Sequence, residues 1–428
     1  MEFLDFLQNT PTAFHAVKEF KDLLLKQNYV ELQESKLWNL EKSGKYFFTR
    51  NNSTIVAFSV SKDISDLSYN IVAAHTDSPT FKIKPNNDLK KGEYHLLNTE
   101  IYGGPILNTW LDRRLNIAGR VIVKEDGKLV TKLLSFDRGV VVIPNCSIHY
   151  YHELNDGVKL NPQNELVPLL TEGNKNLMDL VAEKLNVKKE DIVSHDLYLA
   201  SLDRGGLFGA DNEYMNAPQI DNLECSFAGI KALTAATPKS GSVNVCVLFD
   251  NEEIGSRTRQ GAGSKILADT LRRISLNLGL TEEAHIVALN NSFLISADNA
   301  QGFHPNYAHK YDPTNACYMN KGIAIKNAAR GSYTTDALSL AYFTEICKKA
   351  GSKYQLNTNR SDVPGGGTLG AISLSQVSIP SVDIGLPQIS MHSIMETAGV
   401  NDYFDLEKAL KEFYSNHFSF DKDGIVKF

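Results

Sequence analysis

The chain has 428 residues, of which 42% are hydrophobic and 22% charged, and its formal net charge is −6. This composition is typical of a globular protein and argues against a disordered or fibrous one. It also argues against a nucleic-acid partner, because such proteins present an excess of positive charge. At about 100–200 residues per domain, the length predicts two or three folded units.

The N-terminal stretch and the cysteines indicate a cytoplasmic protein. Glu2 and Asp5 stand where a secretory signal would carry basic residues and then an apolar run. The sequence holds no run of about 18 apolar residues, so we expect no membrane-spanning helix. The five cysteines are scattered and form no Cys-x-x-Cys pair, which fits a reducing compartment rather than a disulfide framework.

The first part of the chain predicts a helix followed by strands. Thr10-Pro11-Thr12 is a helix start signal, and apolar residues follow it at helical spacing from Ala13 to Leu24. The apolar runs 53–60 and 70–74 predict strands, and the second run leads directly into His75.

Residues 86–207 have a different sequence pattern, in which a glycine pair and Asp-Gly steps separate short β-prone runs. The clearest case is Asp126-Gly127, which lies between the runs 121–123 and 128–130. An Asp-Gly step with such flanks is the strongest short-range signal for a β-hairpin. We therefore predict a separate, β-rich insertion over residues 86–207.

After residue 207 the predicted strands and helices alternate. Apolar spacing predicts helices at 223–233, 267–278 and 336–350, and strands at 243–249, 286–289, 292–297 and 381–385. Such alternation is typical of an α/β sheet. The sequence thus predicts one α/β domain made of residues 1–85 and 208–428, which the insertion interrupts.

Histidines and carboxylates follow these predicted strands directly. In chain order they are His75, Asp221 at the start of a helix, Asp250 with Glu252 and Glu253, Asp298, and His392 in the loop after 381–385. Open α/β sheets hold their ligands at the carboxyl ends of the strands, so we expect these side chains to converge. A set of nitrogen and oxygen donors of this kind suits Zn²⁺, Mn²⁺ or Co²⁺.

Each of these residues also has a purely structural explanation. Asp221 is well placed to be a helix N-cap, and Asp298 with Asn299 could form a turn. The adjacent glutamates could be a solvated loop pair, and a single histidine is usually a partly buried polar side chain. The coincidence that all of them follow strands or open a helix favours a shared site.

The adjacent glutamates, Glu252 and Glu253, are the most informative pair. Consecutive side chains leaving a strand point in different directions, so one carboxylate can bind a metal while its neighbour acts as a base. A metal lowers the pKa of bound water from about 15.7 towards 7, and a nearby carboxylate can pass the proton to a leaving amine. Asp77, two residues after His75, has the reach of a partner that fixes an imidazole.

These motifs also carry a family resemblance. They are His75-Thr76-Asp77-Ser78-Pro79, Ile220-Asp221-Asn222-Leu223, Asp250-Asn251-Glu252-Glu253-Ile254-Gly255-Ser256, Ser296-Ala297-Asp298 with His304-Pro305-Asn306-Tyr307, and Met391-His392-Ser393. The sequence resembles the M18 metallopeptidases, the aspartyl aminopeptidase family, nearly from end to end. The resemblance implies a mixed-sheet catalytic domain like that of zinc exopeptidases, with the insertion serving dimerisation.

The resemblance also implies a two-metal site that hydrolyses the N-terminal residue of peptides, with Asp or Glu as the preferred first residue. Zinc is the expected metal, with manganese or cobalt as alternatives, and the two ions would activate a water molecule. In the implied site His75 and Asp298 hold one ion, Glu253 and His392 hold the other, Asp221 bridges them, Glu252 is the general base, and Asp77 orients His75.

Substrate selection and assembly follow from the same resemblance. His149, in the segment 143–149, would reach a neighbouring subunit's active site, and Lys326 would meet an acidic substrate side chain. The alternatives are a histidine at a domain surface and a solvated lysine. Gln301 stands where some aspartyl aminopeptidases have a histidine, which weakens the case for strict acidic preference. The implied assembly is a homo-oligomer, a dodecamer built from dimers.

Other functions stay open at this point. A dinuclear amidohydrolase such as an N-acyl amino-acid deacylase would use the same ligands on a blocked amine. A non-catalytic assembly or cargo protein could keep the same scaffold. A serine or cysteine nucleophile is a weak rival, because the sequence has no Gly-x-Ser-x-Gly motif and no evident partner histidine for a cysteine.

Overall fold

The protein is described from a computed structural model that covers residues 1–363 and 365–428. Its α-helices are α1 (Glu2–Leu7), α2 (Ala13–Lys26), α3 (Leu177–Leu185), α4 (Ile220–Ala235), α5 (Ile266–Asn277), α6 (Glu282–Asn290), α7 (Ala337–Ala350), α8 (Leu369–Leu374) and α9 (Val400–Tyr414). The 3₁₀ turns are η1 (Leu107–Trp110), η2 (His152–Asp156), η3 (Lys189–Asp191), η4 (Glu252–Ile254) and η5 (Pro305–Lys310).

The strands up to the end of the long β-rich stretch are β1 (Val30–Glu31), β2 (Lys45–Arg50), β3 (Thr54–Val60), β4 (Ser68–His75), β5 (Thr80–Lys91), β6 (Tyr94–Tyr102), β7 (Arg114–Glu125), β8 (Lys128–Ser135), β9 (Val141–Val142), β10 (Leu169–Thr171) and β11 (Ile192–Ser201). The later strands are β12 (Gly206–Phe208), β13 (Tyr214–Ala217), β14 (Ser242–Phe249), β15 (Phe293–Ala297), β16 (Ala300–Gln301), β17 (Ile323–Lys326), β18 (Tyr354–Asn357), β19 (Ser381–Gly385), β20 (Pro387–Ile389), β21 (Glu396–Gly399), β22 (Ser419–Lys422) and β23 (Ile425–Lys427).

A nine-stranded mixed sheet forms the larger part of the molecule, with the order β1-β2-β3-β14-β4-β15-β19-β17-β18. Its four central strands, β14, β4, β15 and β19, run parallel to one another. Phe249 at the end of β14 pairs with His75 at the end of β4. The carboxyl ends of these strands therefore meet at one edge of the sheet, where an open α/β sheet holds its ligands.

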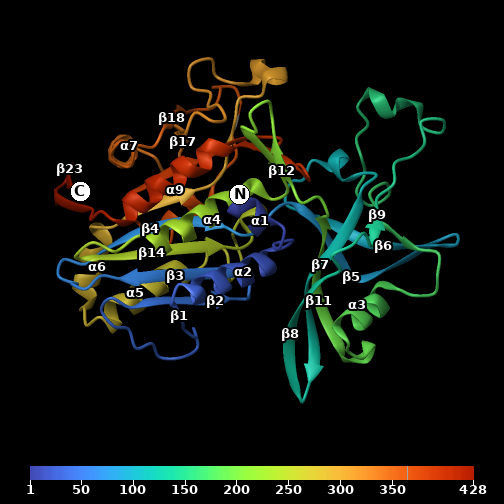
Figure 1. The fold of residues 1–428 in the computed structure, drawn as a ribbon, viewed down its shortest axis with the longest axis horizontal. Helices are drawn as coiled ribbons and strands as arrows, with labels where there is room; N and C mark the ends of the chain where they lie inside the picture. Colours follow the sequence, from blue (N-terminus) through green and yellow to red (C-terminus); the bar gives the residue numbers. More distant parts are fainter. Residues whose placement is uncertain (364) are drawn as a thin grey trace.

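Helices cover both faces of this sheet, as the left part of Figure 1 shows. Residues that alternate along a strand face opposite sides, so Val72 packs into one core and Ile71 into the other. The first core also holds apolar residues of α1, α2, α4, α7 and α9, and the second those of α5 and α8. Strands buried on both faces explain the continuous apolar runs at 70–74 and 243–249.

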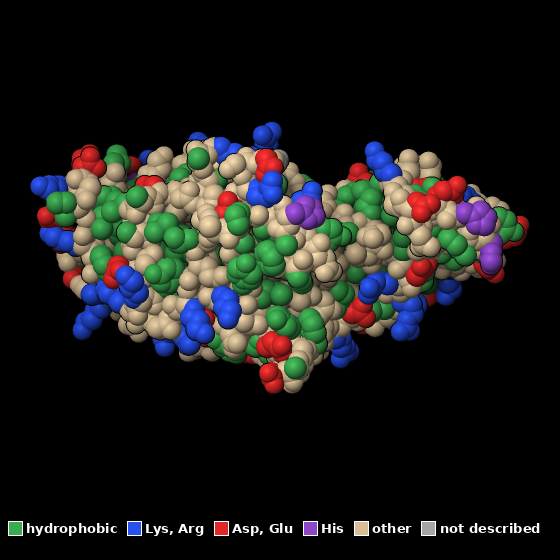
Figure 2. Space-filling model, turned by 90° about the horizontal axis from the view of Figure 1, so that it is seen from above, with side chains coloured by type: hydrophobic (Ala, Val, Ile, Leu, Met, Phe, Trp, Pro, Cys, Tyr) green, Lys and Arg blue, Asp and Glu red, His purple; other side chains and the backbone are tan. Residues whose placement is uncertain are grey.

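A second sheet of seven strands, β11-β5-β6-β10-β9-β7-β8, has its own core beside α3. Strand β11 pairs with both β5 and β7, so this sheet closes on itself. It forms the right part of Figure 1. Viewed from above, the molecule is elongated, and acidic and basic side chains are interspersed over the visible face (Figure 2). A smaller five-stranded sheet has the order β12-β13-β21-β20-β16.

The mixed α/β fold and the Asp126-Gly127 hairpin are confirmed. Strands β7 and β8 pair from Glu125 opposite Lys128, and both turn residues have positive φ, as a tight two-residue hairpin requires. Helix α2 begins at Ala13 after Thr12, as the start signal predicted. The described part of the chain contains no helix that is long and apolar enough to cross a membrane.

One predicted strand is wrong, because residues 286–289 lie in helix α6. The Thr281 side chain accepts a hydrogen bond from the Ala284 N–H and caps this helix. Ile286 and Val287 are about half exposed, at 53% and 52%. The apolar run suggested a strand, but the Thr281 cap and the exposed side chains show a surface helix.

Candidate metal centre

The histidines and carboxylates predicted from the strand ends do converge at the carboxyl edge of the nine-stranded sheet. His75 ends β4, Asp298 follows β15, and Glu252 and Glu253 lie in the turn η4 after β14. His392 follows β20. His75 and Asp298 are buried, at 1% and 8% exposure. The parallel neighbours β14, β4 and β15 bring the glutamates, His75 and Asp298 together, whereas His392 comes from the end of β20 in the five-stranded sheet.

Asp221 lies between the two histidines and turns one carboxylate oxygen to each. Its Oδ1 is 3.5 Å from Nε2 of His75, and its Oδ2 is 3.4 Å from Nε2 of His392. Nε2 of His75 also lies 3.4 Å from Oδ1 of Asp298, and Nε2 of His392 lies 3.5 Å from Oε2 of Glu253. The carboxylate of Asp221 thus faces the cluster, and helix capping does not explain its position.

Both imidazoles present Nε2 to the carboxylates because Nδ1 is occupied by a backbone carbonyl. Nδ1 of His75 donates to the carbonyl oxygen of Asp77 at 3.0 Å, and Nδ1 of His392 donates to that of Gly104 at 3.1 Å. A carbonyl oxygen can only accept, so the proton sits on Nδ1 in the neutral ring. The unprotonated Nε2 is the atom that a metal would bind.

Asp77 is held from several sides. Its Oδ1 lies 3.4 Å from Nδ1 of His75 and accepts a hydrogen bond from the N–H of Glu252 at 3.1 Å. Its Oδ2 accepts from the N–H of Glu253 at 3.2 Å and from the hydroxyl of Tyr102 at 2.7 Å. Asp77 therefore fixes both the neighbouring histidine and the backbone of the two glutamates.

The spacing of the cluster fits a metal ion. One ligand atom each of His75, Asp221 and Glu253 lies within 4.8 Å of the others. Bonds of about 2.0–2.2 Å in a tetrahedral site place neighbouring ligand atoms about 3.4 Å apart. Among the described residues, Asp221 Oδ1 and Glu253 Oε1 are buried without a hydrogen-bond partner. Buried carboxylate oxygens without donors are costly unless a cation satisfies them.

The electrostatics of the cluster show the same need for positive charge. Burial raises the pKa of Glu252 to about 8 and raises that of Glu253, with nearby Asp221 adding to the effect at Glu253. Burial opposes the charged form of His75, but contacts with Asp221 and Asp298 outweigh it and raise its pKa. Several carboxylates packed together cannot all ionise without a counter-charge.

The sequence analysis missed Glu396, which is fully enclosed behind the cluster. Its Oε2 accepts a hydrogen bond from the N–H of Asp221 at 2.9 Å, and its Oε1 accepts from the N–H of His392 at 2.7 Å. One carboxylate thus fixes the backbone of two members of the cluster. Its only sequence signal was its position four residues after His392.

Lys326 lies beside the cluster rather than in solvent, since it is 3% exposed. Its Nζ donates to the carbonyl oxygen of Asn299 at 2.8 Å and lies 3.9 Å from Oδ2 of Asp298. The solvated lysine considered from the sequence is therefore wrong. The side chain also lies over the ring of Tyr333, with Nζ 5.5 Å from its centroid.

His149 lies outside the cluster, in the exposed stretch between β9 and η2. Its backbone N–H donates to Oγ of Ser147 at 3.3 Å. The next residue, Tyr150, is 89% exposed. The structure of a single chain thus leaves His149 free of the cluster, on the surface of the seven-stranded sheet's unit.

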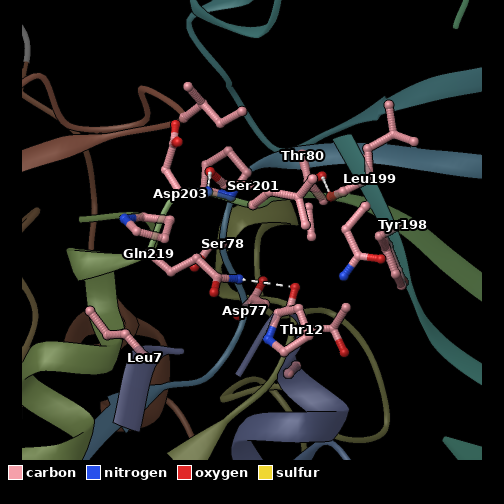
Figure 3. Close-up of a pocket in the computed structure, with 18 of the residues that line it drawn as sticks. Leu7, Thr12, Asp77, Ser78, Thr80, Tyr198, Leu199, Ser201, Asp203 and Gln219 are labelled. Carbon is pink, nitrogen blue, oxygen red and sulfur yellow. Dashed lines mark hydrogen bonds between the residues drawn. The ribbon is translucent and has the colours of Figure 1, made fainter. Parts of the chain in front are cut away.

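A cavity of about 140 Å³ lies beside Asp77 (Figure 3). Its walls come from α2 and from the ends of β5 and β11, and include Thr12, Thr80, Tyr198 and Gln219. Of the residues that the sequence predicted to converge, Asp77 and Asp250 line this cavity, and Glu396 lines it as well. The cavity therefore separates the two large sheets behind the site and is not where the histidines converge.

An α/β fold with a buried histidine–carboxylate cluster at the carboxyl edge of its parallel strands is the arrangement that a metal-dependent hydrolase needs. The sequence profile of the aminopeptidase I zinc metalloprotease family, M18, matches residues 6–414. The chain belongs to this family.

Individual relatives agree with this assignment. The chain is 44% identical over 424 residues to the probable M18 family aminopeptidase 2 of Clostridium novyi, covering 97% of this chain and 98% of that protein. Among solved structures it is similar to the cryo-EM structure of the Ape4 and Nbr1 complex, with a TM-score of 0.93 and 32% identity over 96% of this chain and 84% of that one. It is also similar to the S. cerevisiae mApe1 dodecamer, with a TM-score of 0.83 and 27% identity over 96% and 95%.

The protein is therefore a metal-dependent aminopeptidase, a hydrolase that removes the N-terminal residue of peptides. The comparisons support this reading and not the deacylase or the non-catalytic assembly protein.

Proposed function

We propose that this aminopeptidase works with two divalent ions, with zinc as the native metal and manganese or cobalt as alternatives. His75 and Asp298 would hold one ion, Glu253 and His392 the other, and Asp221 would bridge them. The observation that carries this proposal is the orientation of Asp221, which turns one oxygen to Nε2 of each histidine. When bound, two such ions polarise the scissile carbonyl and lower the pKa of water.

Glu252 is the proposed general base. Its neighbour Glu253 faces His392, whereas Glu252 makes no such contact in the described chain and is half-buried. Asp77 holds the backbone N–H of both glutamates, so the two side chains keep different directions. A carboxylate of raised pKa takes up a proton readily near neutral pH and can then deliver it to the leaving amine.

Lys326 is the proposed contact for an acidic first residue of the substrate. Its ammonium group has three donors, and in the described part of the chain one of them has an acceptor, the carbonyl oxygen of Asn299. The two remaining donors of this buried charge beside Asp298 would bind the substrate carboxylate. Gln301 stands where some aspartyl aminopeptidases have a histidine, which weakens the case for a strict acidic preference. Cleavage rates of peptides with acidic and neutral first residues decide this point.

The proposed assembly is a dodecamer built from dimers in the cytoplasm, with residues 86–207 as the dimerisation domain and 1–85 with 208–428 as the catalytic domain. All strands of the seven-stranded sheet lie between Thr80 and Ser201, which supports a separate unit close to these bounds. The exposure of the stretch around His149 supports its reaching a neighbouring active site. The similar mApe1 structure is a dodecamer, which supports the proposed assembly. The five cysteines of this chain are free thiols, which fits the reducing cytoplasm.

Peptides that differ in their first residue test the activity and the preference together. The full-length protein is reconstituted with Zn²⁺, Mn²⁺ or Co²⁺ and assayed on free and N-acetylated versions of each peptide. We expect release of the first residue from the free peptides only. Glu252→Gln should keep its metal and lose about 10²–10⁴-fold in kcat. Preferred cleavage of acetylated substrates would contradict the proposal, and full activity of Glu252→Gln would remove it as the base.

A further inference from the structure

The hydroxyl of Tyr102 reaches the metal centre from the other large sheet. Tyr102 ends β6 in the seven-stranded sheet, is 8% exposed, and donates to Oδ2 of Asp77 at 2.7 Å. Asp77 follows β4, in the nine-stranded sheet. This bond therefore connects the two large sheets at the residue that adjoins His75.

The Tyr102 hydroxyl is itself fixed. Its oxygen accepts a hydrogen bond from Nδ2 of Asn251 at 2.8 Å. The other end of that amide, Oδ1 of Asn251, accepts from the Thr258 hydroxyl at 2.8 Å and from Nε2 of Gln260 at 2.9 Å. Burial and the charge of Asp77 raise the pKa of Tyr102, so the hydroxyl stays protonated as a donor. The donor thus has one orientation.

The carboxylate of Asp77, which this donor holds, contacts three neighbours. Its carboxylate lies 3.4 Å from Nδ1 of His75 and accepts from the N–H groups of Glu252 and Glu253. A carboxylate with fixed donors on both oxygens cannot rotate freely. Loss of the nearest donor, the tyrosine hydroxyl at 2.7 Å, would loosen all three contacts.

The residues after Tyr102 reach the second histidine. The carbonyl oxygen of Gly104 accepts from Nδ1 of His392 at 3.1 Å, and the N–H of Ile106 donates to the carbonyl oxygen of His392 at 2.9 Å. Gly103 has a φ of +71°, and a Cβ there would stand 3.1 Å from Cβ of Glu253. Glycine at this position allows the segment to pass this close to the cluster.

We propose that Tyr102 is a positioning residue of the metal centre: by holding Asp77 it fixes His75 and the turn that carries both glutamates. The segment 102–106 thereby ties both histidines to the seven-stranded sheet. This inference rests on the proposed ligand set. Removing an outer partner of a metal-binding histidine typically weakens metal binding about 10–100-fold.

Tyr102→Phe tests the proposal, with Tyr198→Phe as its matched control. The two rings pack edge to edge, 5.6 Å apart at 82°, and both line the cavity behind Asp77. Each variant of the full-length protein loses one tyrosine hydroxyl beside this cavity. Among the described residues, Tyr102 donates a hydrogen bond to Asp77 and Tyr198 does not. Zinc affinity is measured by competition with a chromogenic chelator. The visible absorption spectra of the Co²⁺-loaded proteins report the geometry of the metal site.

For Tyr102→Phe we expect zinc binding about 10–100-fold weaker, an altered Co²⁺ spectrum, and a lower kcat with little change in KM. Tyr198→Phe should match the wild type in all three, and the metal-free forms should melt alike. In an Asp77→Asn background, adding Tyr102→Phe should cost little more, because both changes break one chain of contacts.

A wild-type zinc affinity and Co²⁺ spectrum for Tyr102→Phe would overturn the inference. Equal losses in both tyrosine variants would also overturn it, since they would show a packing role. If the wild-type protein binds zinc and cleaves peptides, and Tyr102→Phe behaves like it, only this inference fails and the proposed function is unaffected. A wild-type protein that binds no metal contradicts the proposed function, and this inference fails with it.

Discussion

Nζ of Lys326 lies 3.9 Å from Oδ2 of Asp298 in the interior of the protein. Burial opposes the charged form of this lysine, but Asp298 and other nearby groups outweigh it, so the pKa of Lys326 is raised and the ammonium stays charged. The pair places one permanent positive charge at the rim of a cluster of carboxylates. That charge can serve two tasks, substrate binding and support of Asp298, which a substitution can separate.

Lys326→Gln should lower kcat/KM for peptides that begin with Glu by about tenfold or more beyond its effect on peptides that begin with Leu. A hydrogen bond to a charged group contributes about 1.5–3 kcal/mol, and only the acidic substrate would lose one. Steady-state kinetics on the two peptides measure the ratio. Lys321→Gln, at an exposed lysine, is the control and should leave the ratio unchanged. Equal losses on both peptides would confine Lys326 to supporting Asp298.

The convergence of the site was predictable because it depends on a local rule. Apolar runs such as 243–249 mark strands buried on both faces, and parallel strands bring their carboxyl ends to one edge. A polar residue directly after such a run, as at His75 or Asp298, is then placed by its own strand. The hairpin at Asp126-Gly127 was predictable for the same reason, since its turn depends on two adjacent residues.

The residues that support the site were not predictable in this way. Glu396 lies in a short strand that pairs with β13 and β20, and its task is visible only when the backbones of Asp221 and His392 are placed beside it. Tyr102 acts across the two sheets, from a segment that reads as an ordinary β-strand. Contacts between distant segments leave no periodic signal in the sequence.

Glu396→Gln should weaken zinc binding about 10–100-fold, the usual effect of losing an outer partner of a metal site. The amide keeps one acceptor oxygen, whereas the carboxylate accepts from the N–H of Asp221 with one oxygen and from that of His392 with the other. Competition with a chelator measures the affinity. An unchanged zinc affinity would show that the rest of the fold holds these two backbones without Glu396.

His15 should make the folded state sensitive to moderate acid. Burial lowers the pKa of His15 from 6.5 to about 4, with Asp137 opposing and Lys18 adding to the shift, and its Nδ1 lies 2.8 Å from Oγ1 of Thr12. Below pH 6.5 the unfolded chain takes up a proton that the folded chain refuses, so stability is full above pH 6.5 and falls towards pH 4.

The His15 contribution lost between pH 6.5 and 5 is about 1.5 kcal/mol. Urea unfolding of the wild type and of His15→Gln at both pH values measures it. The wild type should lose this much more than the variant, because the variant lacks the titrating group. Parallel losses in the two proteins would assign the acid sensitivity to other groups, such as the carboxylates of the site.

His149 and Glu252 should complement each other between subunits. His149→Ala and Glu252→Gln should each be nearly inactive alone, the first because its neighbours receive no histidine and the second because it lacks the base. In a mixed oligomer, a His149→Ala subunit keeps Glu252 and receives an intact His149 from its Glu252→Gln partner. Random pairing in symmetric dimers should then restore about one quarter of wild-type activity.

Co-expression of the two variants with different affinity tags, followed by purification through both tags, yields the mixed oligomers for this test. Sedimentation establishes that the mixed and the parent proteins have the same assembly size. Co-expressed Glu252→Gln subunits alone, carrying both tags, are the control and should stay inactive. If the His149→Ala parent is inactive and the mixed oligomers recover no activity, His149 acts in the active site of its own subunit. A fully active His149→Ala parent, or a fully active monomer, would remove this residue from the reaction, because the exposed stretch around it would then have no partner site to complete.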